Sequence, residues 1–98
     1  MHYAVIARDK PGLLSLRLAK RDEHRTFLHG DLSGYRVAVV FGGPLLSPDE
    51  ETPIGTLMVI EASSVDDVKA LVADDPYSRA SLFDHVEITP WRFAVGRR

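Results

Sequence analysis

Apolar residues along this chain gather in four short runs that are separated by turn-forming residues. The runs are rich in β-branched and aromatic side chains, which favours β-strands over helices. Turn chemistry at Asp9-Lys10-Pro11-Gly12 ends the first run, and Gly42-Gly43-Pro44 ends the second. The acidic, proline-containing stretch Leu45–Pro53 predicts an exposed loop. The four predicted strands are Tyr3–Arg8, Tyr35–Phe41, Ile54–Ala62 and His85–Val95.

The segment Leu13–Leu28 predicts an amphipathic helix whose apolar face carries basic residues. At about 100° per residue, Arg17, Arg21 and His24 fall within the apolar stripe, in a sector of roughly 60°. The opposite face is polar. Buried guanidinium and imidazole groups need partners, or a wet cavity that holds an anionic or polar ligand. We therefore expect the functional site on this face of the helix.

A second helix is predicted from Val65 to about Asp74, where apolar residues recur at helical spacing. Ser64, with a carboxylate three residues later at Asp67, resembles a capping box at its start. Pro76 ends the helix and forces Asp75 toward an extended backbone. Tyr77–Phe83 then predicts a turn or a short third helix.

The order of elements is β-α-β-β-α-β, which is the pattern of an α+β, ferredoxin-like fold. That fold has a four-stranded antiparallel sheet with both helices on one face, so the other face is left uncovered. Because the strands are apolar, we expect two sheets to pack face to face in a homodimer. Pro90 indicates an edge position or a bulge in the last strand, and Arg97-Arg98 is expected as a frayed tail. Residues 1–98 are expected to form a single domain.

The amino-acid composition of the chain argues against several classes of function, namely nucleic-acid binding, membrane binding and metal binding. The net charge is −2, from 12 basic and 14 acidic residues, so no broad field favours nucleic acid or an anionic membrane. The chain has no cysteine and no run long enough for a membrane span, and we expect a cytoplasmic protein. We expect no metal site, because the histidines lack ligand spacing. These are His2, His24, His29 and His85.

Motifs spread over the whole chain resemble the YciI-like (YCII-related) family. They are Arg21-x-x-His24, Gly42-Gly43-Pro44, Gly55, Glu61-Ala62, Asp75-Pro76-Tyr77, Val86-Glu87-Ile88 and Pro90-Trp91. The resemblance implies a dimeric α/β barrel of ferredoxin-like subunits, with an active site built on a histidine and an aspartate. Those two roles fall on His24 and Asp75.

His24 and Asp75 are our candidate catalytic pair. A histidine accepts or donates a proton near neutral pH. A carboxylate bonded to one ring nitrogen fixes the tautomer of the ring and raises the basicity of the other nitrogen. The competing interpretation is a satisfied core histidine beside a turn aspartate. Arg21 is equally suited to hold a substrate anion or to form a structural ion pair. For Arg17 we favour an ion pair over substrate binding, with an acidic residue such as Asp75, Glu61 or Asp84 at the sheet edge or across the dimer.

Three further residues are candidates for substrate contact. Gly43 and Pro44 could let the backbone approach a ligand, although a tight strand exit explains them as well. Tyr77 could line an aromatic pocket wall, and the alternative is a core or interface position.

The leading functional hypothesis is a small cytoplasmic enzyme without a bound cofactor. His24 and Asp75 would act on a small organic substrate by hydrolysis, isomerisation or dehalogenation. An alternative is a ligand-binding or regulatory module with the same pocket and no chemistry. A lesser alternative is a cofactor-free oxygenase of the same barrel type.

Overall fold

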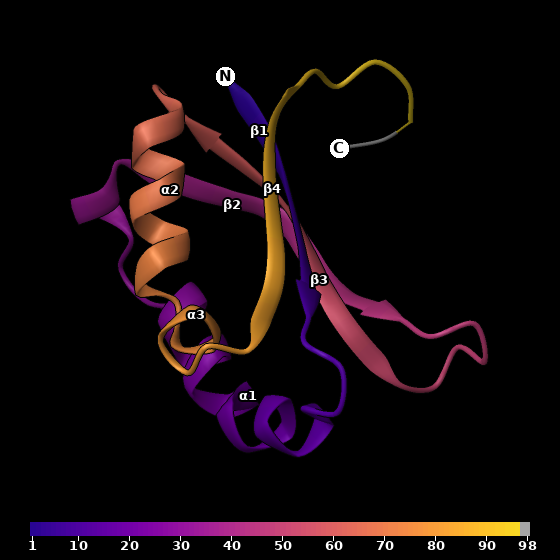
Figure 1. Ribbon diagram of the computed structural model, residues 1–98. Coiled ribbons are helices and arrows are strands. Elements are labelled where there is room, and N and C mark those ends of the chain that lie inside the picture. The colour runs from indigo at the N-terminus through magenta and orange to yellow at the C-terminus, as the bar shows by residue number, and fades with distance from the viewer. Residues whose placement is uncertain (97–98) are drawn as a thin grey trace.

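The computed structural model describes residues 1–96, and the expected tail at Arg97 and Arg98 lies outside the described residues. Four strands form one antiparallel sheet in the order β2-β3-β1-β4, with the helices on a single face (Figure 1). This confirms the ferredoxin-like fold. The elements are β1 (His2–Asp9), α1 (Leu14–His29), a 3₁₀ turn (Ser33–Tyr35), β2 (Val37–Leu46), β3 (Pro53–Ala62), α2 (Val65–Asp74), α3 (Pro76–Arg79) and β4 (Phe83–Trp91).

The core lies between α2 and the two central strands. Alternate residues of β1 and β3 point to the helix side of the sheet, as a strand's period of two requires. They meet one apolar stripe of α2, whose spacing follows the helical repeat. The buried cluster comprises Tyr3, Val5, Met58, Ile60, Ala62, Val68, Leu71 and Val72.

The start and end of α2 agree with the prediction. Its N-cap is Ser64, whose hydroxyl accepts a hydrogen bond from the backbone N–H of Asp67. Asp75 has φ −58° and ψ 134°, the extended conformation expected before Pro76. The chain then turns into α3, so the expected short third helix is present and begins at Pro76.

The predicted end of the second strand was wrong. Gly42-Gly43-Pro44 lies inside β2 rather than at a strand exit, and the strand begins at Val37 instead of Tyr35. Proline is tolerated there because β2 is an edge strand. Gly42 is needed because a Cβ at this position would lie 2.9 Å from Cγ of Met58. The loop that follows is consequently shorter than the predicted Leu45–Pro53.

The last strand is shifted toward the N-terminus, since β4 covers Phe83–Trp91 instead of His85–Val95. Its position at the edge of the sheet agrees with the prediction from Pro90. Among residues 1–96, no helix has the length and apolar character needed to cross a membrane.

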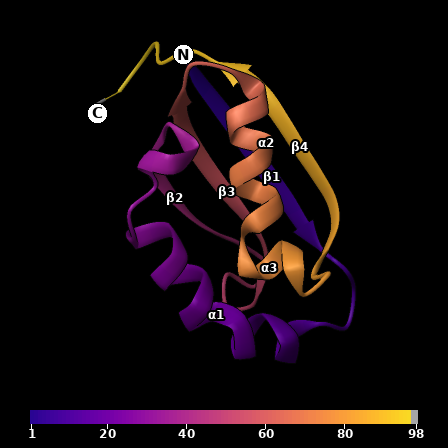
Figure 2. The same ribbon diagram turned by 90° about the vertical axis from the view of Figure 1, so that its left-hand side faces the viewer.

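Helix α1 stands apart from the centre of the sheet. Figure 2 shows it below α2 and beside β2, and its main contacts are with α3. Only its C-terminal half, through Phe27 and Leu28, packs against the core cluster. The face of α1 that carries Arg17, Arg21 and His24 lies over β2 and β3 instead.

Candidate active site

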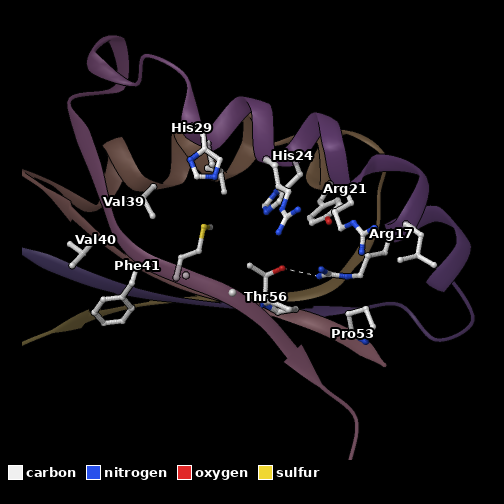
Figure 3. A pocket seen from close by; sticks show the side chains of 17 residues that line it. Arg17, Arg21, His24, His29, Val39, Val40, Phe41, Pro53 and Thr56 are labelled. Atoms are coloured by element: carbon white, nitrogen blue, oxygen red, sulfur yellow. Dashed lines mark hydrogen bonds between the residues drawn. The ribbon is translucent and has the colours of Figure 1, made fainter. Parts of the chain in front are cut away.

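A cavity of about 500 Å³ lies between α1 and the strands β2 and β3 (Figure 3). One wall is the basic face of α1, and the floor is formed by β2 and by Thr56 and Met58 of β3. Tyr77 of α3 closes one side. A volume of this size suits a small organic molecule.

The cavity brings together six of the seven predicted site residues. Its lining includes Arg17, Arg21, His24, Gly43, Pro44 and Tyr77. Asp75, the seventh, lies behind His24 and is only 2% exposed. The basic face of α1 therefore does border a cavity, as its pattern of polar and apolar residues suggested.

His24 and Asp75 are joined within one chain. Nδ1 of His24 lies 2.9 Å from both Oδ1 and Oδ2 of Asp75. Since a carboxylate only accepts, Nδ1 carries the proton and donates it, which leaves Nε2 as the unprotonated nitrogen of the neutral ring. The Asp75 side chain is 3% exposed and that of His24 is 13% exposed. Water therefore competes little for this bond.

The backbone around Asp75 holds its carboxylate in place. Asp75 is the N-cap of α3, and its Oδ1 accepts a hydrogen bond of 2.9 Å from the backbone N–H of Tyr77. Pro76 occupies the first helical position, where its missing N–H costs nothing. One carboxylate thus caps a helix and orients an imidazole.

Tyr77 packs against the ring of His24. The two ring centroids are 4.0 Å apart and the planes are inclined by 15°, which is a stacked arrangement. The Arg17 guanidinium carbon lies 4.6 Å from the centroid of the same tyrosine ring. Burial raises the pKa of the Tyr77 phenol, while the positive charges of Arg17 and Arg21 oppose that rise. Tyr77 thus limits rotation of the His24 ring.

Arg17 forms an ion pair with a residue that the sequence analysis did not select. Its Nε and Nη2 donate to the two carboxylate oxygens of Asp9, at 2.6 and 3.0 Å. Nη2 also donates to Oγ1 of Thr56 at 2.8 Å. The ion pair favoured for Arg17 is therefore present, but its partner is Asp9 and not Asp75, Glu61 or Asp84. Asp9 could have been found, because a Pro-Gly turn after β1 brings its end close to the first turn of the next helix.

Arg21 and two missed residues complete the basic wall. Arg21 is exposed and borders the cavity, and Arg25 and His29 follow it along α1 at intervals of four residues. The sequence carried this signal, since residues four apart share one face of a helix. Gly43 and Pro44 contribute lining from β2. Within residues 1–96, no group of three histidine, aspartate or glutamate side chains could hold a metal ion.

Sequence comparison relates the chain to known proteins over nearly its whole length. A profile described as the YCII-related domain matches residues 1–92. The chain is 28% identical over 97 residues to the protein YciI of Escherichia coli, covering 94% of this chain and 97% of that protein. An uncharacterized protein of Haemophilus influenzae matches with the same identity and coverage.

A solved structure among those that match is similar in both fold and sequence. It is the 5-chloro-2-hydroxyhydroquinone dehydrochlorinase TftG of Burkholderia phenoliruptrix, in complex with 2,5-dihydroxybenzoquinone. The TM-score is 0.82 and the identity 26%, and the match covers 96% of each chain. A NIPSNAP domain protein of Burkholderia xenovorans, at 12% identity and a TM-score of 0.51, shares the fold alone.

Proposed function

We propose that this chain, which belongs to the YCII-related domain family, is a small cytoplasmic enzyme that transfers protons on a small cyclic organic substrate. In this proposal His24 is the general acid and base, and Asp75 is the positioning residue that orients it. One observation carries the proposal: both carboxylate oxygens of Asp75 lie 2.9 Å from Nδ1 of a histidine that borders the cavity. In such a pair the carboxylate holds the ring in one tautomer and one orientation, so that Nε2 can act as the base.

The proposed chemistry begins with proton transfer from an acidic C–H or O–H of the substrate to Nε2 of His24. The resulting oxyanion is held by the guanidinium of Arg21, which borders the same cavity. The electron pair then expels a halide in a dehalogenation, or the proton returns at another carbon in an isomerisation. In a hydrolysis, Nε2 takes the proton from the attacking water instead. No bound cofactor is needed for any of these steps.

Of these three reactions, the loss of hydrogen halide from a ring is the one that we test first. The similar protein TftG carries the name of a dehydrochlorinase and binds a dihydroxybenzoquinone. The cavity of this chain has an apolar floor, with Val39 and Met58 among its lining residues. An apolar floor below a basic wall suits a ring that bears ionisable oxygens.

The test is a screen of chlorinated hydroxyquinols and related ring compounds, followed by chloride release and by the change in ultraviolet absorption. We expect His24→Gln to lower kcat by about 10²- to 10⁴-fold, the usual contribution of a general acid or base. Asp75→Asn keeps an oxygen that can cap α3, so it should fold and still lose most of the rate. His85→Gln on β4 is the matched control, because His85 is exposed and does not line the cavity. Unchanged turnover in His24→Gln refutes the proposal.

A second measurement needs no substrate. The ¹⁵N chemical shifts of the His24 ring report which nitrogen carries the proton in the neutral form. We expect protonated Nδ1 in the wild type and a mixture of tautomers in Asp75→Asn. A wild-type ring protonated on Nε2 would contradict the assigned base.

A non-catalytic binding module is the second candidate, and the exposed Arg21 on the cavity wall favours it. In that case a small organic anion binds without turnover, its affinity survives His24→Gln, and Arg21→Ala abolishes it. The screen separates the two candidates, because an enzyme consumes at least one compound that it binds.

We also propose that the chain forms a homodimer through the sheet face opposite the helices. Ala4, Ile6 and Leu57 point to this face, because they alternate with buried residues that point to the helices. Phe41, which lies opposite Val59 in the sheet, is 46% exposed. An apolar sheet face of this kind is normally covered by a partner.

A further inference from the structure

The cavity wall carries basic side chains that do not belong to the proposed catalytic pair. Five basic residues of α1 line it, and the lining contains no aspartate or glutamate. Arg17 is neutralised by Asp9, and His24 is bonded to the carboxylate of Asp75. Arg21, Arg25 and His29 remain, and within residues 1–96 none of these three has an ion pair. These three basic side chains therefore border the space that a ligand would occupy.

These three residues are distributed along the cavity. They are spaced by four residues, and at 1.5 Å per residue they span about 12 Å along the helix axis. Figure 3 shows Arg21 on one side of His24 and His29 on the other, above Val39. Along α1, Arg21 therefore precedes His24, whereas Arg25 and His29 follow it, with His29 toward the far end of the cavity.

We propose that Arg25 and His29 form an anion subsite, which holds a carboxylate on the substrate ring away from the reacting atom. The substrate class is then a hydroxylated ring carboxylate. Its ring lies on the apolar floor, and its ionisable oxygen lies between His24 and Arg21. This inference rests on the proposed function for the position of the reacting atom, but carboxylate binding itself requires no turnover. A charge-assisted hydrogen bond to Arg25 supplies affinity, and the apolar floor supplies the fit of the ring.

A different role for these residues would give a different result. Basic side chains near the C-terminal end of a helix also stabilise that helix through its dipole. In that role Arg25 and His29 would contribute to thermal stability and would not discriminate between a carboxylate and its neutral amide. The two roles are separated by measuring ligand affinity and thermal unfolding on the same variants.

The experiment compares three probes by isothermal titration calorimetry: 2,5-dihydroxybenzoate, 2,5-dihydroxybenzamide and hydroquinone. We expect the wild type to bind the carboxylate about tenfold more tightly than the amide, as one charge-assisted hydrogen bond provides. Arg25→Gln with His29→Gln should reduce this preference to less than about threefold and leave the amide affinity unchanged. Arg36→Gln is the control, because Arg36 pairs with Asp67 and does not line the cavity.

Equal wild-type affinity for the carboxylate and the amide overturns the proposal, and so does a preference that persists in the double variant. Failure of the carboxylate to bind at millimolar concentration also overturns it. Asp75→Asn distinguishes this proposal from the catalytic one, since it should lose most of the turnover rate and keep the carboxylate preference. If the wild-type protein shows that preference but turns over none of the ring compounds, the proposed anion subsite stands and the proposed enzymatic function is refuted.

Discussion

The ion pair between Arg17 and Asp9 is the contact on which the geometry of the cavity wall should depend most strongly. It is bidentate, with donor–acceptor distances of 2.6 and 3.0 Å, and the side chains are 4% and 8% exposed. Arg17 also donates to Thr56 and lies over the ring of Tyr77. Removing one partner therefore leaves the other charge buried.

We predict that Asp9→Asn lowers the free energy of unfolding by about 3–5 kcal/mol, the usual cost of leaving one buried charge uncompensated. That is a large part of the roughly 5–15 kcal/mol available to a domain. For a chain of this size it lowers Tm by about 12 °C or more. Arg17→Met removes the charge and fills similar space, so the double variant should regain at least about 2 kcal/mol relative to Asp9→Asn.

The assay is urea unfolding followed by circular dichroism, with all variants compared at one pH and salt concentration. The matched control is Arg36→Met, which breaks the pair between Arg36 and Asp67 at 3.4 Å, where the arginine side chain is 78% exposed. An exposed pair of this kind contributes less than about 1 kcal/mol. The reasoning is refuted if Asp9→Asn costs no more than the control, or if the double variant is less stable than either single variant.

Two further predictions concern the pH dependence of stability and the assembly of the chain. Because burial raises the pKa of Tyr77, the folded chain keeps this proton where an unfolded tyrosine, with a pKa of about 10, ionises. The resulting stability is fully present below pH about 10 and is lost as the pH rises through the folded pKa. Urea unfolding of Tyr77→Phe should therefore show a shallower decline above pH about 10, and an unchanged slope would contradict this. In sedimentation equilibrium we expect the wild type to have twice the mass of the 10.9 kDa chain and Leu57→Lys to sediment as a monomer; a monomeric wild type would rule out the dimer.

Local chemistry made several elements predictable from the sequence. Ser64 with Asp67 marks the start of α2, and Pro76 marks its end, because capping and the lost N–H act over three or four residues. The basic face of α1 was predictable for the same reason, since side-chain direction on a helix follows from its repeat. His24 and Asp75 were selected as residues, but their distance from each other was not determined by any local pattern.

Contacts between distant segments decided the rest. Whether Gly42-Gly43-Pro44 ends a strand or continues it depends on its position at the sheet edge and on the approach of Met58 to Gly42. The partner of Arg17 depends on where β1 ends relative to the first turn of α1. The sequence by itself determined the order of the elements and the residue types on the basic helix face, because these follow from periodicity and turn chemistry. Only the tertiary structure decided that His24 meets Asp75 and that Arg17 is neutralised by Asp9, because such pairings arise when packed helices and strands bring distant residues together.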